Sequence, residues 1–181
     1  LVAPETPTGE AILCINPEDQ VYTSVVGMGE ELTWTLDPQE AGVLVFEAEM
    51  ATVAWADDFV GEAMISVQIT SLCATSEFSL PLVVIVHALP EFAMEENAVA
   101  CYGQNVEIAA DLTGTAPWTI NIMGVGEMTV AESPYVFTWE AMQDSSFTVD
   151  MVTDANGCVN DVMHTASVLV NELPVVDLGE D

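Results

Sequence analysis

Apolar and polar residues alternate along most of this chain, so that every second side chain has the same character. In the stretch ELTWTLD, Leu32, Trp34 and Leu36 fall on one face, and two threonines fall on the other. A period of two is typical of a strand with one buried and one solvated face, whereas a helix repeats after about 3.6 residues. The same alternation occurs in residues 63–70, 105–112 and 146–153. The chain is therefore predicted to be all-β, with antiparallel sheets and little helix.

The sequence repeats itself with a period of about one small domain. VHALP ends at Pro90 and VNELP ends at Pro174, 84 residues later, each after a β-rich run. This period predicts two domains, residues 1–89 and 90–174, followed by residues 175–181 as a linker or the start of a further repeat. About seven short strands in each domain favour two sheets packed face to face in a β-sandwich.

The charge of the chain has one sign only. Its 181 residues include 30 Asp and Glu but neither Lys nor Arg, with 14 of the acids in residues 1–89 and 16 in residues 90–181. Nucleic acid and anionic membrane surfaces are excluded as partners, because both are bound through Lys and Arg. Salt bridges to Lys or Arg and lysine-dependent isopeptide bonds are impossible, so stability must come from apolar burial, backbone hydrogen bonds and disulfides. The uniform charge strains the compact state by self-repulsion, which salt relieves by screening.

No stretch is predicted to enter a membrane. The most apolar run, LPLVVIVHALP (Leu80 to Pro90), is shorter than the roughly 18 to 20 residues of a span and contains His and Pro. The first ten residues lack the basic and apolar regions of a signal peptide. The protein is expected to be soluble.

Two motifs in the second half resemble those of a known class of repeats. They are LTGTAPW (Leu112 to Trp118) and VTDANGC (Val152 to Cys158). Together with PTGEAILCIN and ATVAWADDFVGEAMISVQITSLC in the first half, they are similar to PKD-like, immunoglobulin-like repeats found in tandem in very large secreted and surface proteins of Bacteroidota. The closing LPVVDLGED resembles the opening of a further repeat.

The resemblance covers nearly the whole chain and implies two tandem immunoglobulin-like (PKD-like) antiparallel β-sandwich domains. It also implies export, commonly by the type IX secretion route, and display at the cell surface in adhesins, gliding-motility filaments or other appendages. It provides no catalytic residue. Relatives usually contain some Lys and Arg, so their complete loss here indicates selection on the whole surface.

The stretch VTDANGCVND, from Val152 to Asp161, allows two interpretations. It offers four oxygen-bearing side chains, as a calcium loop would, in Asp154, Asn156, Asn160 and Asp161. An EF-hand loop starting at Asp154 would need Gly at position 6 and Glu at position 12, but Gly falls at position 4 and Thr at position 12. Asn-Gly between two alternating runs instead predicts a two-residue β-hairpin turn, which is the favoured interpretation.

A second group of possible calcium ligands lies in the first domain. Asp57 and Asp58 fall in a predicted loop with Glu62 nearby, and a solvated turn is the favoured interpretation. No cofactor is expected, and any calcium bound to these carboxylates, or to Asp154 and Asn156, is expected to bind weakly and without a structural role. A calcium-dependent, cadherin-like rod would instead need carboxylates that converge near Glu91, Glu95 and Glu96.

The four cysteines follow the same repeat. Cys14 and Cys73 lie 59 residues apart, and Cys101 and Cys158 lie 57 residues apart. Four cysteines allow three pairings, and the repeat favours a Cys14–Cys73 and a Cys101–Cys158 disulfide. Each would close a long loop, stabilise its domain by roughly 4 kcal/mol and indicate an oxidising compartment. A zinc site is disfavoured because the chain has no Cys-x-x-Cys pair.

The four tryptophans decide between a scaffold and a sugar-binding surface. All lie in alternating runs, so they are predicted to pack in the sandwich cores: Trp34, Trp55, Trp118 and Trp139. A carbohydrate-binding module would instead expose coplanar aromatic rings.

No enzyme is predicted, because nucleophile-elbow, zinc-protease and phosphate-loop motifs are missing, and both histidines, His87 and His164, are expected to be structural. The sequence therefore predicts a structural and adhesive repeat segment of a large extracellular filament or adhesin, acting as a stiff spacer or filament wall. Its expected partners are neighbouring repeats of the same chain, further copies in a filament, and a cell-surface or polysaccharide ligand. The alternative is a carbohydrate-binding module of a secreted protein.

Overall fold

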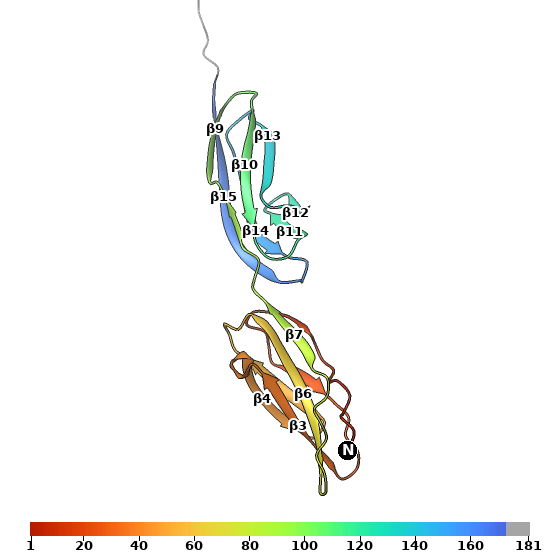
Figure 1. Cartoon of the computed structure of the whole chain (residues 1–181). Helices are drawn as coiled ribbons and strands as arrows, with labels where there is room; N and C mark the ends of the chain where they lie inside the picture. Colours follow the sequence, from red (N-terminus) through yellow and green to blue (C-terminus); the bar gives the residue numbers. More distant parts are fainter. Residues whose placement is uncertain (173–181) are drawn as a thin grey trace, which may run out of the picture. The chain divides into compact units, whose positions relative to one another are not determined.

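The computed structural model describes residues 1–172 and divides the chain into two compact units (Figure 1). They are Leu1–Ala88 and Leu89–Asp181, so the change of unit falls within one residue of the boundary that the repeat predicts. The predicted linker at 175–181 and Pro174 lie outside the described residues.

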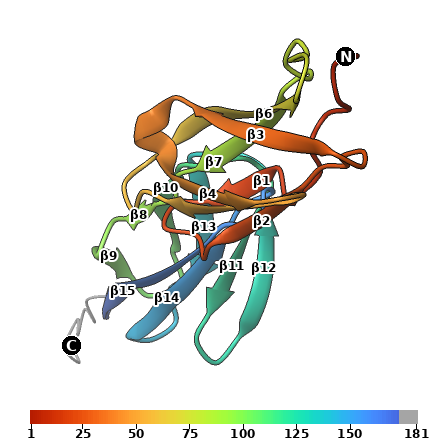
Figure 2. The same cartoon turned by 90° about the horizontal axis from the view of Figure 1, so that it is seen from below.

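The first unit contains seven strands in two sheets. One sheet has the order β1-β7-β6-β3 and the other β2-β5-β4. All neighbouring strands are antiparallel except β1 and β7. Figure 2 shows β3 and β6 in one layer and β2 and β4 in the other. The strands are β1 (Ile12–Cys14), β2 (Gln20–Thr23), β3 (Glu30–Asp37), β4 (Gly42–Glu47), β5 (Met50–Trp55), β6 (Gly61–Ser71) and β7 (Leu82–His87), with a short 3-10 helix η1 (Gln39–Ala41) between β3 and β4.

The alternation in the sequence produces the core of the first unit. The predicted inward face of ELTWTLD is buried at Leu32, Trp34 and Leu36, whereas Thr33 is exposed. β6 buries its odd-numbered apolar residues against the same interior. Burial of apolar surface at about 25 cal/mol per Å² therefore supplies the main stabilisation, as it must in a chain without Lys or Arg. The core consists of Leu13, Tyr22, Leu32, Trp34, Leu36, Ala41, Ala51, Val53, Trp55, Ala63, Ile65, Val67, Val84 and Val86.

Residues 89–172 of the second unit form eight strands. One sheet has the order β13-β10-β8 and the other β12-β11-β14-β15-β9, in which β15 and β9 are parallel. The strands are β8 (Phe92–Met94), β9 (Asn97–Cys101), β10 (Asn105–Leu112), β11 (Trp118–Ile122), β12 (Gly126–Val130), β13 (Tyr135–Glu140), β14 (Ser145–Thr153) and β15 (Val159–Asn171). Both units are thus antiparallel β-sandwiches, as predicted. Within residues 1–172, no helix is long and apolar enough to cross a membrane.

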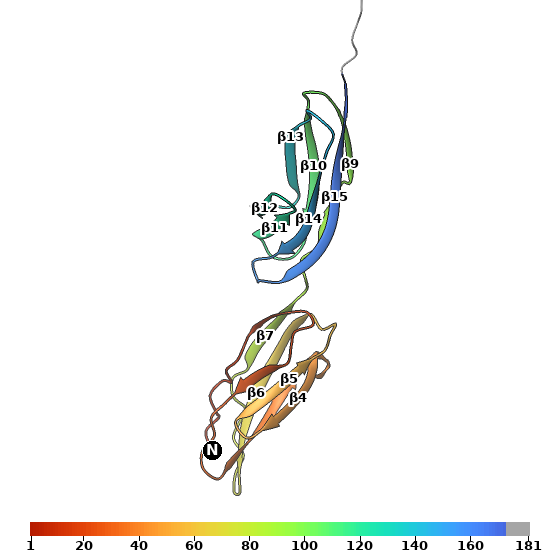
Figure 3. The same cartoon turned by 180° about the vertical axis from the view of Figure 1, so that it is seen from behind.

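The two units differ in the sheet to which one strand belongs. In the second unit β12 stays beside β11 in one sheet. In the first unit β4 crosses to the sheet opposite β3. Both β3 and β4 are therefore edge strands, and β4 lies outside β5 in the view from behind (Figure 3).

Candidate functional site

Asp154 closes the hairpin at VTDANGCVND with its buried carboxylate. Its side chain is buried, and Oδ1 accepts hydrogen bonds from the backbone N–H groups of Asn156 at 2.9 Å and Cys158 at 3.0 Å. Oδ2 accepts one from the backbone N–H of Thr115 at 3.1 Å. Gly157 adopts a φ of +83°, but Asn156 does not adopt a positive φ, so the two-residue turn predicted for this Asn-Gly pair is not formed. The carboxylate thus accepts hydrogen bonds from backbone donors. The hairpin is confirmed, but Thr153 pairs with Val159, so the connection has five residues, Asp154 to Cys158, and the predicted two-residue length is wrong.

The same contact joins the motifs LTGTAPW and VTDANGC. The backbone N–H of Ala155 donates to the carbonyl of Thr115 at 2.9 Å, and Asn156 Nδ2 donates to Thr115 Oγ1 at 2.8 Å. Gly114 adopts a φ of +90°, and a Cβ at this position would lie 3.1 Å from Asp154 Oδ2. LTGTAPW and VTDANGC are therefore two halves of one structural contact, which explains their residue types without a ligand.

The remaining calcium candidates do not form a site. Asp57 and Asp58 are exposed in the turn between β5 and β6, and Glu62 is exposed on β6. Glu91, Glu95 and Glu96, the candidates for a cadherin-like junction, are also exposed. Within residues 1–172, no group of three or more His, Cys, Asp and Glu side chains is arranged to hold a metal ion.

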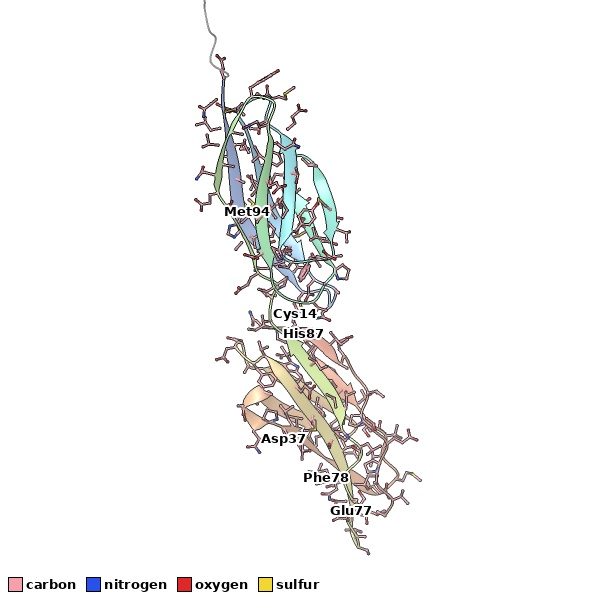
Figure 4. All side chains as sticks on the ribbon, turned by 45° about the horizontal axis from the view of Figure 1, so that its top comes forward. Cys14, Asp37, Glu77, Phe78, His87 and Met94 are labelled. Carbon is pink, nitrogen blue, oxygen red and sulfur yellow. The ribbon has the colours of Figure 1, made fainter. Side chains whose placement is uncertain are left out.

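The predicted cysteine pairing is wrong. Cys73 and Cys101 are free, exposed thiols, whereas Cys14 and Cys158 are disulfide-bonded. The register explains why neither predicted pair forms. Cys14 lies opposite His87 at one end of the first unit, and both are labelled there in Figure 4.

The first residue of β6, Gly61, pairs with Val86 and so lies at the same end of the unit as Cys14. Cys73 follows the last residue of β6, at the opposite end. This 11-residue strand spans about 33 Å at roughly 3.3 Å per residue, whereas a disulfide needs Cα atoms within about 7 Å. In the second unit, Cys101 pairs with the last residue of the 13-residue β15, and Cys158 directly precedes its first residue. Equal spacing identified equivalent positions in the two sandwiches, but those positions lie at opposite ends of each one.

Three of the four tryptophans are core residues, as predicted. Trp34, Trp55 and Trp118 are buried, and Trp118 Nε1 donates to the carbonyl of Thr113 at 2.7 Å. Trp139 is half-buried and packs edge to face against Phe147, with ring centroids 4.8 Å apart. The coplanar exposed rings that a carbohydrate-binding module needs are therefore not formed by these side chains.

The two histidines contact their own units. His87 ends β7 opposite Cys14, and His164 packs against Phe92 with ring centroids 5.8 Å apart. Both positions agree with the structural role that the sequence predicts.

A groove of about 590 Å³ lies over β9, β15 and the start of β14. Its walls are polar and aliphatic, with Ser145, Ser146 and Ser167 beside Val99 and Leu169. Asp144 at its end already accepts a hydrogen bond from the backbone N–H of Val170 at 2.7 Å. No aromatic ring lines this groove, so it offers no stacking platform to a sugar.

Among the described residues, Tyr22 is the titratable group whose pKa departs clearly from its ordinary value. Its ring is fully buried in the first unit, and its hydroxyl donates to the backbone carbonyl of Glu10 at 3.1 Å. Burial raises the pKa of Tyr22 to about 12, while the nearby Trp55 indole N–H opposes this rise and the negative charge of Glu10 adds to it. Tyr22 is thus a core residue whose ionisation is opposed by the fold.

The outer face of the sheet β2-β5-β4 is the candidate interaction surface, and the sequence analysis missed it. Its large apolar side chains are exposed, with Val43 at 65% and Val45 at 66%. The register places Val21, Thr52 and Val45 in one row across the three strands. We call this surface the β4 face; it comprises Val21, Thr23, Val43, Val45, Glu47, Met50, Thr52 and Ala54.

A groove of about 430 Å³ runs along the free edge of β4, between β4 and β3. Leu36 and Trp34 line it from β3, and Gly42, Leu44 and Phe46 line it from β4. The Nε1 atom of Trp34 is buried without a hydrogen-bond partner. The signal for this surface was the apolar run GVLVF, which alternates less clearly than a strand with one solvated face should.

Comparison with known proteins shows the fold. No family model matches the sequence. No curated protein matches it either. Among solved structures, an I-band fragment of titin aligns with a TM-score of 0.56 at 13% identity, over 94% of this chain and 66% of that chain. A marsupial T cell receptor aligns with a TM-score of 0.53 at 11% identity, over 95% of this chain and 74% of that chain.

The fibronectin(III)-like modules of CbhA from Clostridium thermocellum align with a TM-score of 0.42 at 13% identity, over 96% of this chain and all of that chain. At these identities the likeness concerns the fold alone. The protein consists of tandem immunoglobulin-like β-sandwich domains.

Proposed function

We propose that this chain is a structural segment of a large extracellular protein, in which the two sandwiches act as a spacer or filament wall. The carrying observation is that each unit closes its own apolar core and that only Ala88 to Glu91 separate β7 from β8. Pro90 fixes its own φ and biases Leu89 towards an extended conformation. Such a connection limits bending between consecutive modules, as a spacer requires.

The proposed location of this segment is the cell surface. Disulfide-bonded Cys14 and Cys158 favour an oxidising compartment. The motifs LTGTAPW and VTDANGC support membership of the PKD-like repeats of Bacteroidota and export by the type IX route. Neighbouring repeats, other copies of the chain and a surface polysaccharide are the proposed partners, in an adhesin or a filament.

Carbohydrate binding is the weaker proposal. It has the serine-lined groove on β9 and β15 in its favour, but Trp34, Trp55 and Trp118 are buried.

Small-angle X-ray scattering of the whole chain tests the spacer function. A sandwich whose longest strand has 13 residues is about 40 Å long, so two in line span roughly 80 Å. The expected result for the natural chain is a maximum particle dimension near that value. When Leu89 and Pro90 are both replaced by Gly, this dimension should become smaller or the distribution of dimensions wider. A matched control replaces Val2 and Ala3, which are exposed in the N-terminal coil, by Gly. A folded-back, short particle for the natural chain would contradict the spacer function.

A further inference from the structure

The free edge of β4 can hydrogen-bond to another strand. β4 pairs only with β5, and alternate residues of an antiparallel strand turn their N–H and C=O groups away from the partner. The Ala56 N–H donates to the Ala41 carbonyl at 2.9 Å, so Ala41, and every second residue after it, turns its backbone groups towards β5. Gly42, Leu44 and Phe46 therefore direct their backbone groups outward. These same residues line the open groove, so the edge is accessible.

The β4 face also carries little of the charge that covers the rest of the molecule. Glu47, at the hairpin end, is its only acidic member. The outer faces of the other sheets present several carboxylates each. Glu31, Asp37 and Glu62 lie on the sheet of β3 and β6, and Glu107, Asp111 and Glu140 lie on the sheet of β10 and β13.

Natural proteins commonly protect a long apolar edge strand with Lys or Pro, because a free edge pairs with other chains. β4 contains neither residue. Here the protection must come from the net charge of −30, which repels other copies at long range. Such protection weakens with salt, since the screening length falls from about 10 Å at 0.1 M to about 3 Å at 1 M.

The occupant that these features fit is a second copy of this chain. A basic partner would bind the carboxylate-rich faces in preference, because on the β4 face it could form an ion pair with Glu47 alone. Two copies repel each other at those faces, and the β4 face is where the repulsion is least. We propose that two copies associate through antiparallel pairing of their β4 edges, which joins two three-stranded sheets into one of six strands.

The side chains of β4 fit a two-fold pairing centred on Leu44. In that register Leu44 faces its own copy, Phe46 faces Gly42 and Val45 faces Val43. The Phe46 ring of each copy meets a glycine, which leaves room for it to enter the groove. Glu47 faces Ala41, so the two carboxylates are kept apart.

This inference deepens the proposed function, because a filament wall needs lateral contacts between chains, and it rests on that function for its biological role. The edge of one six-residue strand is a small interface, below the roughly 800 Å² per partner of a stable complex. The association is therefore expected to be weak, with a Kd on the order of 100 μM in 1 M NaCl.

Sedimentation equilibrium between 0.05 and 1 M NaCl tests the proposal on the whole chain carrying Cys73→Ser and Cys101→Ser, so that the exposed thiols cannot cross-link copies. A dimer fraction that rises with salt is expected. Val45→Glu should weaken the association at least tenfold, because it adds a carboxylate to each copy at the joined face. Val99→Glu is the matched control, since Val99 is also 66% exposed but lies on β9, and it should leave the association unchanged.

Two further measurements secure the interpretation. Unchanged melting temperatures of both variants show that they fold. A mixture of Val43→Cys and Val45→Cys chains should form a disulfide-linked heterodimer under mild oxidation, because the proposed register brings these two positions face to face. A monomer at every salt concentration, or a dimer that Val45→Glu does not weaken, would overturn the inference. Scattering at low salt and low protein concentration, where the chain is monomeric, tests the spacer function independently of this association.

Discussion

Asp154 and Thr115 lie 39 residues apart in the chain, yet the backbone N–H of Thr115 donates a hydrogen bond to Asp154 Oδ2 at 3.1 Å. This contact connects the turn after β14 with the loop before β11. Asp154 also accepts two bonds from its own turn, so one buried carboxylate organises two loops. Its role is structural, although its sequence context is typical of calcium ligands.

Replacing Asp154 by Ala should destabilise the second unit. Three backbone N–H groups would lose their acceptor, and each buried donor left unpaired costs about 1–3 kcal/mol, partly relieved by water. The expected loss is on the order of 3 kcal/mol in the free energy of unfolding, measured by urea denaturation. Asp161→Ala is the matched control, because Asp161 is exposed on β15, and it should change the stability by less than about 0.5 kcal/mol. Equal effects of the two substitutions would contradict the role given to Asp154.

Removal of divalent metal should leave the fold unchanged. The oxygens of Asp154 are occupied by N–H donors, and Asp57, Asp58 and Glu62 are exposed. The melting temperature with excess EDTA should therefore match that with 5 mM calcium, at constant ionic strength, within about 1 °C. Magnesium at the same concentration controls for screening by any divalent cation. A rise produced by calcium alone would show that a specific site exists.

Much of this fold was predictable because period-two alternation reports burial directly. Leu32, Trp34 and Leu36 are buried as their spacing requires, and the Asn-Gly pair at Asn156 marks the turn. Whether a strand stays in its sheet or crosses to the other depends on contacts distant in sequence. The alternation gives no sign that β4 leaves β3, so the open edge could not be foreseen.

The cysteines show a different limit of sequence reasoning. Their spacing correctly indicated equivalent places in two repeats, because Cys14 and Cys101 both end the strand that runs parallel to the last strand of their unit. Spacing gives no information on distance across a sheet. Only the register shows that the second cysteine of each unit lies at the far end.

Thiol labelling tests the assignment of the cysteines. Iodoacetamide added to the native protein should modify Cys73 and Cys101, which are exposed thiols. Cys14 and Cys158 should react only after reduction, since they are disulfide-bonded. Cleavage with an acid-specific protease and mass spectrometry identify the modified peptides. Modification of all four before reduction, or of none, would contradict this assignment.

Tyr22 should make the first unit sensitive to alkali. Its pKa is about 12 in the folded protein and about 10 in the unfolded chain, so folding favours the neutral phenol. The stability from this preference is fully present below about pH 10 and is lost as the pH rises from 10 to 12. The loss should reach on the order of 2–3 kcal/mol, measured by urea denaturation in this range.

Tyr22→Phe should remove this part of the pH dependence. At pH 7 it should cost only about 1 kcal/mol, for the hydrogen bond to the Glu10 carbonyl. Tyr102→Phe is the control, because Tyr102 is 49% exposed, and it should leave the alkaline loss in place. An alkaline transition that Tyr22→Phe does not alter would contradict the burial of the phenol.

Salt should stabilise both units through the charge of the chain. The 30 carboxylates have no Lys or Arg partner, so compaction brings like charges together and screening lowers the resulting repulsion. The melting temperature should rise by several degrees between 0.02 and 0.5 M NaCl, at a protein concentration well below that at which copies associate. Glucose at equal osmolarity controls for effects other than screening. Because the repulsion is spread over the surface, Glu107→Gln and Asp58→Asn should each raise the low-salt stability by only a few tenths of a kcal/mol, and their effects should add. A large gain from one substitution would instead locate the strain at a single site.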